Sequence, residues 1–124
     1  MPSKILTVKG HCYSKKNHRP IFRAGRRGRP FLGKTNTLKQ YENVALLQIK
    51  AQWGSWPALS SWVEVVLVIR FAGPTPDAFG PSETIFDCLQ AAGVVKNDSL
   101  LCPQAVIRER VKKGQEEVEI RLDW

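Results

Sequence analysis

Residues 62–71, with the sequence WVEVVLVIRF, form the longest apolar stretch of the chain. β-Branched and aromatic side chains fit the pleated surface of a sheet, and a nearly continuous apolar run is typical of a strand covered on both faces. Glu64 and Arg70 interrupt the stretch, and it is much shorter than the roughly 20 residues that cross a bilayer. We therefore expect a central strand here and no transmembrane helix.

A helix is predicted on each side of this strand. Before it, Thr37 can cap a helix that runs to about Trp53 and ends at Gly54. After it, Pro81 suits the first turn of a second helix and Gly93 its end. The apolar side chains spaced by three or four residues are expected to face the core: Leu38, Tyr41, Ala45, Ile49 and Trp53 in the first helix, and Ile85, Cys88, Leu89 and Ala92 in the second.

Further strands are predicted at residues 5–8, 105–111 and 117–122, with a turn at 112–115. Residues 20–23 and 29–32 flank a glycine-bearing arginine segment and resemble a β-hairpin, whose prolines favour edge strands. A length of 124 residues suits one hydrophobic core. The expected architecture is α/β (α+β): a single domain over residues 1–124, with a mixed sheet of about four to six strands and two main helices.

The positive charge is concentrated near the N-terminus. Residues 1–40, the basic N-terminal block, contain eleven Lys or Arg and no acid, whereas residues 41–124 contain eight bases and all eleven acids. This asymmetry favours a polyanionic partner. An anionic membrane is disfavoured, because no amphipathic basic helix or lipidation motif is present. The candidate DNA-binding residues are Lys15, Lys16, Arg19, Arg23, Arg26, Arg27 and Arg29.

The three cysteines lie far apart and form no C-x-x-C pair. With only two histidines, they do not provide the four closely spaced ligands of a structural zinc site. Reduced, structural thiols are expected. The N-terminus lacks the pattern of a secretory signal, so a cytoplasmic protein with no membrane partner is predicted.

Residues 28–35, GRPFLGKT, formally match the phosphate-binding loop pattern G-x-x-x-x-G-K-T. In such a loop, backbone amides surround phosphate at the start of a helix. Pro30 lacks one of these amides, and residues 62–71 end without the acidic residue of a magnesium-binding partner. A basic hairpin followed by a turn accounts for the same residues. No nucleotide cofactor is therefore expected.

Four acidic residues occur within 22 positions: Asp77, Glu83, Asp87 and Asp98. Carboxylates that hold divalent ions on either side of a phosphate are what metal-dependent phosphodiester hydrolysis needs, and Mg²⁺ prefers such oxygen ligands. The alternative is structural. Glu83 and Asp87 would then form a solvated helix face, and Asp77 and Asp98 would be turn residues.

Residues 77–101 resemble the active-site segment of the RusA family of Holliday-junction endonucleases. That family carries D-x-D-N, a lysine, F-D-x-L, A-G and a final D-D or N-D pair. The corresponding letters here are Asp77-Ala78-Phe79-Gly80, Glu83, Phe86-Asp87-Cys88-Leu89, Ala92-Gly93 and Asn97-Asp98, without a gap. Gly10, Ser14-Lys15-Lys16-Asn17, the basic hairpin, Tyr41 and the C-terminal strand pair are similar too, so the resemblance covers nearly the whole chain.

The acidic motif is partly degenerate. Phe79 replaces the family's second aspartate, Gly80 its asparagine and Glu83 its lysine, whereas Asp77, Asp87 and Asp98 are retained. Glu83 brings back a carboxylate one helical turn beyond Phe79. Lys96 is the remote candidate for the missing cation.

The resemblance implies a structure-selective endodeoxyribonuclease that acts on four-way junctions in recombination and repair, as a homodimer with Mg²⁺ or Mn²⁺. Asp77 and Asp98 would hold the metal, with Glu83 as a third ligand and Asp87 assisting. A second hypothesis is a RusA-like protein that binds branched DNA without cutting it. A third, an RNA-binding protein of ribosomal type, explains the basic charge but not the spaced acids.

Overall fold

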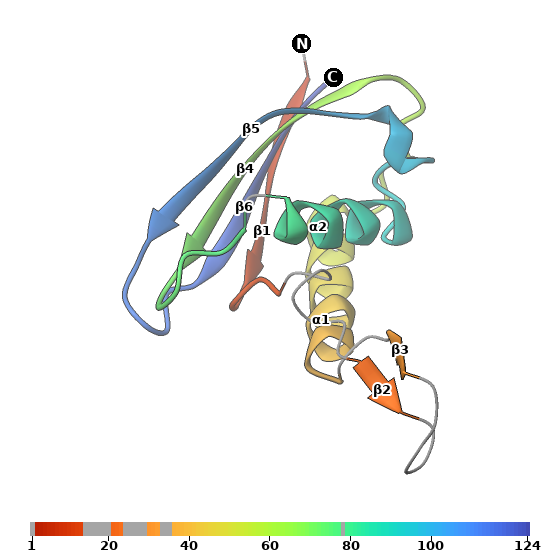
Figure 1. The fold of residues 1–124 in the computed structure, drawn as a ribbon. Helices are drawn as coiled ribbons and strands as arrows, with labels where there is room; N and C mark the ends of the chain where they lie inside the picture. Colours follow the sequence, from red (N-terminus) through yellow and green to blue (C-terminus); the bar gives the residue numbers. More distant parts are fainter. Residues whose placement is uncertain (1, 14–20, 24–29, 33–35, 78) are drawn as a thin grey trace.

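The computed structural model describes residues 2–13, 21–23, 30–32, 36–77 and 79–124. A four-stranded mixed sheet carries two helices on one face (Figure 1), so the predicted α+β architecture is confirmed. In chain order the elements are β1 (Ser3–Lys9), β2 (Ile21–Arg23), β3 (Pro30–Leu32), α1 (Asn36–Trp53), β4 (Val63–Phe71), α2 (Gly80–Ala91), the 3-10 helix η1 (Asp98–Leu100), β5 (Leu101–Arg110) and β6 (Glu117–Asp123).

Strand β4 lies inside the sheet, as its sequence predicts. The strand order is β1-β6-β4-β5, with β6 antiparallel to both neighbours and β5 parallel to β4. Successive side chains of a strand point to opposite faces. Those of β4 that are buried toward the helices are Val63, Val65, Leu67, Ile69 and Phe71.

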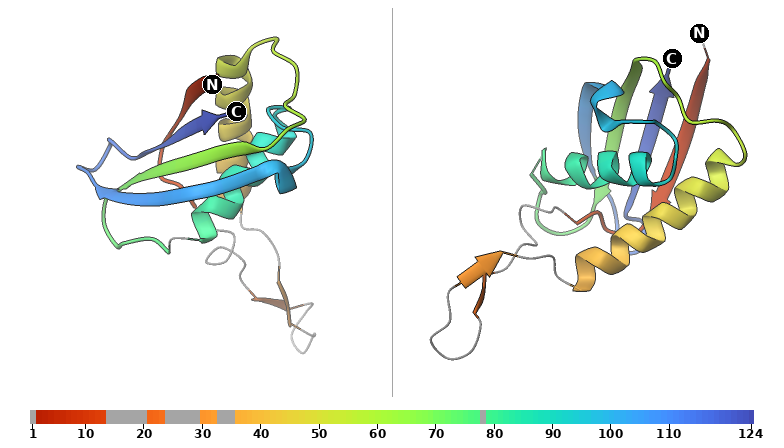
Figure 2. Two further views of the ribbon diagram at one scale, coloured as in Figure 1. Left: turned by 90° about the horizontal axis from the view of Figure 1, so that it is seen from above. Right: turned by 90° about the vertical axis from the view of Figure 1, so that its right-hand side faces the viewer.

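The two helices cover this face of the sheet, and the two views of Figure 2 show both packed on the same side. Almost all of the apolar positions predicted for them are buried: Leu38, Tyr41, Ala45, Ile49 and Trp53 in α1, and Ile85, Cys88 and Leu89 in α2, with Ala92 half-buried. Gly54 and Gly93 follow the helices with positive φ angles of 71° and 79°, a conformation that glycine adopts without steric cost.

One predicted boundary is wrong. Thr37 is not the residue before α1, because the helix already includes Asn36. Helix ends shift by a residue or two depending on local hydrogen bonding, and residues 33–35 lie outside the described part of the chain.

Helix α2 and η1 connect the parallel strands β4 and β5. Parallel neighbouring strands require such a crossover connection. Because β4 and β5 run in the same direction, their C-terminal ends, at Phe71 and Arg110, meet at one edge of the sheet. Ligands bind preferentially outside this edge in sheets with parallel strands. The segment that leaves β4 at this edge, residues 72–79, leads directly to the acidic residues of α2.

Two arginines of β5 hold this segment. Arg110 Nη1 donates to Gly73 O at 2.6 Å, and its guanidinium lies 4.8 Å from the ring centroid of Phe71. Arg108 Nη1 donates to Pro76 O at 3.2 Å. These bonds tie the segment before Asp77 to the edge strand.

The sheet face opposite the helices carries an ion-pair network around Arg70 of β4. Arg70 Nη1 lies 3.0 Å from Glu117 Oε2 and 3.5 Å from Glu119 Oε1, both on β6. Its Nε lies 3.7 Å from Glu109 Oε1 on β5. Burial opposes the charge of Arg70, but the carboxylates, that of Glu119 first, raise its pKa. The hydrogen bond from Arg121 lowers the pKa of Glu119 in spite of partial burial, and Arg70 adds to this shift.

Glu119 is expected to make the fold less stable in acid. The pKa of Glu119 in the folded chain lies below its usual value of 4.5. Its ion pairs therefore contribute fully to the free energy of unfolding above pH 4.5, and this contribution is lost as the pH falls through the folded-state pKa. We expect the free energy of unfolding, measured with urea, to decrease by on the order of 1 kcal/mol for this group in that range. Glu119→Gln should remove this part of the pH dependence.

The control is Glu64→Gln, at a position of β4 on the same face of the sheet as Arg70. Glu64 is exposed and has no ion pair among the residues that the structure describes. This variant should retain the acid sensitivity of the parent chain. Equal pH dependence of the Glu119→Gln variant and the parent would contradict the prediction.

Strands β2 and β3 form a separate two-stranded antiparallel sheet, in which Arg23 pairs with Pro30 and Ile21 with Leu32. Figure 1 shows this pair beyond the N-terminal end of α1. The strand portions of the predicted hairpin are thereby confirmed. In the part of the chain that the structure describes, no helix has the length and apolar character to cross a membrane.

Candidate functional site

Asp77 lies just before α2 and is half-buried. Its Oδ1 accepts a hydrogen bond from Phe79 N at 3.2 Å, and Phe79 O accepts one from Glu83 N at 3.1 Å. The carboxylate of Asp77 therefore shapes the turn that starts the helix, as short acidic side chains commonly do. This geometry agrees with the structural alternative, in which Asp77 is a turn residue. The second carboxylate oxygen of Asp77 accepts no hydrogen bond from the described residues.

Phe79 occupies the N-cap position of α2. It makes no side-chain capping bond, and its side chain is 72% exposed. A cap residue usually accepts a hydrogen bond from the first turn of the helix, which phenylalanine cannot do. The phenyl ring instead borders a shallow pocket of about 330 Å³ along the edge strand β5, lined by Pro103, Gln104, Ala105 and Val106.

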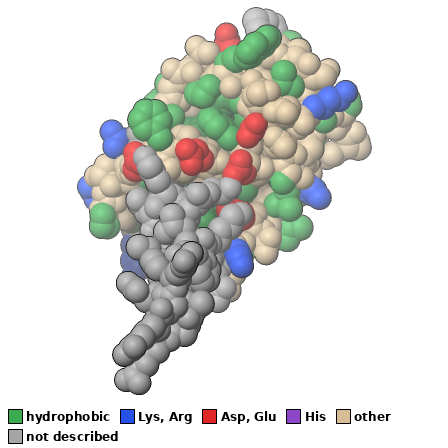
Figure 3. All heavy atoms as spheres, turned by 45° about the vertical axis from the view of Figure 1, so that its right-hand side comes forward, with side chains coloured by type: hydrophobic (Ala, Val, Ile, Leu, Met, Phe, Trp, Pro, Cys, Tyr) green, Lys and Arg blue, Asp and Glu red, His purple; other side chains and the backbone are tan. Residues whose placement is uncertain are grey.

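Two more of the acidic residues, Glu83 and Asp87, lie on α2. Glu83, Asp87 and Gln90 are spaced by four and three residues, so they share one face of the helix. At the far end, Gln90 Oε1 accepts a hydrogen bond from Asp98 N at 2.8 Å. Figure 3 shows several acidic side chains close together on one face of the molecule. The structure thus arranges these acids as a row.

This row does not gather the predicted metal ligands around one point. Asp77 and Glu83 lie at the start of α2, whereas the backbone N–H of Asp98 is bonded to the side chain of Gln90, about two helical turns beyond Glu83. No group of three or more His, Cys, Asp or Glu side chains within the described ranges is placed to hold a metal ion. The described residues do not form the predicted three-ligand set within one chain. A shared Mg²⁺ or Mn²⁺ therefore stays a prediction.

Most of the predicted DNA-binding residues lie outside the described part of the chain. Arg23 belongs to β2, and only its backbone position is described. The others, outside the described residues, are Lys15, Lys16, Arg19, Arg26, Arg27 and Arg29. Within the loop-like pattern at 28–35, residues 30–32 form strand β3 paired with β2, which agrees with a hairpin.

The fold brings together cations that the sequence did not single out. Arg108 and Arg110 end β5, and Lys112 and Lys113 lie in the turn to β6. His11, about a hundred residues earlier in the chain, lines the same pocket as Lys113. They lie at the edge where residues 72–79 leave the sheet. No local motif could reveal this grouping, because it depends on the pairing of β1, β4 and β5 with their neighbours.

The cysteines match the prediction of reduced, structural thiols, since all three are free. Burial raises the pKa of the Cys12 thiol to about 12. A thiol with such a pKa is a poor nucleophile at neutral pH. Cys12 Sγ approaches Pro81 O at 3.9 Å, so this side chain packs the end of the N-terminal strand against the start of α2.

Comparison with models of protein families finds no match to this chain, and comparison with curated proteins finds none either.

Proposed function

We propose that this chain is a RusA-like protein that binds branched DNA, with the four-way junction as its preferred form. The observation that carries the proposal is the position of the acidic segment, which starts at the C-terminal edge of a parallel strand pair and continues along α2. Its register matches the family motif without a gap, and the basic N-terminal block, residues 1–40, precedes it in the chain.

Binding is driven by the phosphate backbone. Lysine and arginine contacts to phosphates position a duplex without reading its sequence, which suits recognition of a DNA shape. Besides the basic N-terminal block, the end of β5 and the turn to β6 contribute Arg108, Arg110, Lys112 and Lys113. A homodimer, the expected assembly, would present two such surfaces related by a twofold axis, as a four-way junction does.

Metal-dependent cleavage of the junction is the second candidate function. It is favoured by the retention of Asp77, Asp87 and Asp98 around one helix. It is disfavoured by Phe79, whose side chain has no atom that can ligate a metal. The described carboxylates also do not form a three-ligand group within one chain.

One experiment tests both functions. A labelled synthetic four-way junction and a linear duplex of equal length are incubated with the protein, in Mg²⁺, in Mn²⁺ and in chelator. We expect retardation of the junction at protein concentrations that leave the duplex free. Equal affinity for the two DNAs would overturn the proposal.

Cleavage is read from the same samples on a denaturing gel. Symmetric nicks that require metal and disappear in Asp98→Asn would establish a nuclease. A retarded but intact junction in every metal would establish a binding protein. Asp98→Asn is a suitable control because Asp98 is exposed and its backbone N–H, not its carboxylate, makes the bond to Gln90.

A further inference from the structure

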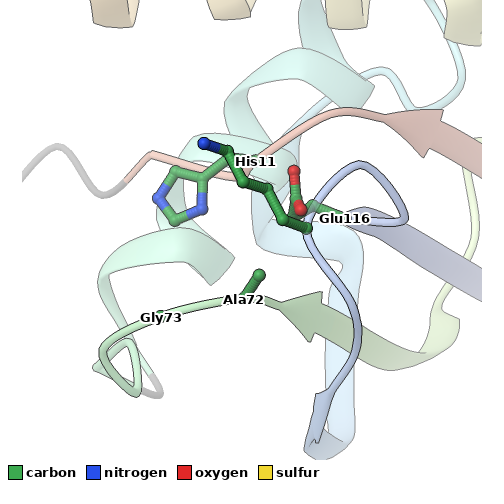
Figure 4. Close-up of a pocket in the computed structure, with 5 residues that line it drawn as sticks. His11, Ala72, Gly73 and Glu116 are labelled. Carbon is green, nitrogen blue, oxygen red and sulfur yellow. The ribbon is translucent and has the colours of Figure 1, made fainter.

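A pocket of about 350 Å³ lies at the C-terminal edge of β4, apart from the acidic row of α2. Its lining comes from three distant segments: His11 after β1, Ala72 and Gly73 after β4, and Lys113 and Glu116 between β5 and β6. Figure 4 shows His11 and Glu116 on opposite sides of the pocket, with Ala72 and Gly73 along its floor. We call it the His11–Lys113 pocket.

Several hydrogen-bond acceptors of the lining residues already have partners. Gly73 O accepts from Arg110 Nη1 at 2.6 Å. Glu116 O accepts from Gly10 N at 2.9 Å, and Glu116 Oε1 accepts from Gly114 N at 2.6 Å. The backbone of the turn thus engages one oxygen of the only carboxylate among the lining residues.

The hydrogen-bond donors of the lining side chains, in contrast, have no acceptors among the described residues. Among the described residues, the ammonium of Lys113 has neither an ion pair nor a hydrogen bond, and the imidazole of His11 makes no hydrogen bond. The imidazole lies edge-on to the Tyr13 ring, at 4.8 Å between centroids. Arg110, whose guanidinium donates to the lining residue Gly73, adds a positive charge beside the pocket. A concave surface with unused N–H donors and surplus cationic charge suits an anion with several acceptor oxygens.

We propose that the His11–Lys113 pocket binds one phosphate group of the DNA backbone, with Lys113 Nζ and the His11 imidazole as donors. The identification of DNA as the source of this phosphate rests on the proposed function. The pocket borders the segment that leads to Asp77, so a DNA strand held there passes beside the start of α2. The His11–Lys113 pocket thereby extends the DNA-binding surface from the basic N-terminal block to the acidic edge of the sheet.

Glu116 makes the proposal specific. Its negative charge opposes an anion in the pocket, so Glu116→Gln should tighten phosphate binding, whereas Lys113→Ala and His11→Gln should weaken it. If these residues contributed only general surface charge, alanine substitution of Lys113 and of its neighbour Lys112 would weaken phosphate binding equally. Lys112 is exposed, as Lys113 is, but does not line the pocket, so Lys112→Ala is the matched control.

The first test uses a small ligand. Thymidylyl thymidine, which carries one phosphodiester, is titrated into the whole chain while the imidazole signals of His11 are followed by NMR; His11→Gln assigns them against those of His18. We expect a saturable shift that Lys113→Ala abolishes and Lys112→Ala retains. Absence of a saturable shift, or its persistence in Lys113→Ala, would overturn the proposal. So would equal affinity for inorganic phosphate, which would assign the pocket to the free anion.

The second test measures junction affinity as a function of salt. Each phosphate contact contributes about 0.9 to the slope of log affinity against log salt, so Lys113→Ala should lower the slope by about 0.9 per chain, and Lys112→Ala should lower it less. A junction that binds tightly with equal slopes in both variants would refute the pocket and leave the proposed function intact. A chain that binds the dinucleotide but does not prefer the junction would refute the proposed function alone.

Discussion

Replacing Phe79 with aspartate is expected both to stabilise α2 and to raise any metal-dependent cleavage of junction DNA. Phe79 is the N-cap residue without a capping bond, and its ring is largely exposed. Aspartate can accept a hydrogen bond from the first turn and interacts favourably with the helix dipole. The free energy of unfolding should therefore rise by about 0.5–2 kcal/mol, as measured by urea denaturation.

The same substitution places a carboxylate two residues after Asp77, at the position of the family's second aspartate. Changes in the outer shell of a metal site alone alter metal affinity or activity by about 10–100-fold, so a restored ligand should change the rate of nicking in Mg²⁺ or Mn²⁺ by at least that factor. The readout is the single-turnover rate on a labelled four-way junction, with the parent chain assayed beside the variant.

Phe79→Asn separates the two effects. Asparagine caps a helix as well as aspartate does, but it brings no negative charge to the site. We expect Phe79→Asn to be stabilised to a similar extent without a gain in cleavage. Equal cleavage by the Asp and Asn variants, or no gain by either one, would show that the missing carboxylate does not limit a metal site here.

Neutralising the basic N-terminal block should weaken junction binding strongly and flatten its salt dependence. A variant with alanine at Lys15, Lys16, Arg26 and Arg27 loses up to four phosphate contacts, and hence about 3.6 from the salt slope. Between about 50 and 200 mM salt, the advantage of the parent chain over this variant should then shrink by about a hundredfold. Fluorescence anisotropy of a labelled junction measures both affinities.

The control variant carries alanine at Lys50, an exposed lysine of the acidic part of the chain. Its salt slope should stay close to that of the parent. If the loss in slope per removed charge were the same in the two variants, binding would depend on net charge, and the basic N-terminal block would not be the DNA-binding surface.

The fold was predictable wherever a local pattern and the tertiary packing demand the same residues. Leu38, Tyr41 and Ile49 repeat at helical spacing and are buried in α1, because a helix can bury only one face against a sheet. The alternation of Glu119 and Arg121 with buried apolar residues likewise marks β6 as a strand with one charged face. These periodicities are properties of the sequence itself.

The arrangement of the acidic residues was less predictable. Their spacing predicted that Glu83 and Asp87 share one face of a helix, and both lie one turn apart in α2. The relation of Asp98 to Asp77 depended on the length of α2 and on the bond between Gln90 and the Asp98 backbone, neither of which a motif specifies. Matching letters to a family motif orders the residues along the chain, but it does not give the distances between their oxygens.

The sequence by itself determined the central strand, the apolar faces of both helices and the separation of basic from acidic charge, because each depends on residues that are neighbours in the chain. Only the tertiary structure decided that His11, Gly73 and Lys113 line one pocket and that the acids of α2 form a row. Both results follow from strand order and register, which bring side chains together through backbone pairing between segments up to about a hundred residues apart.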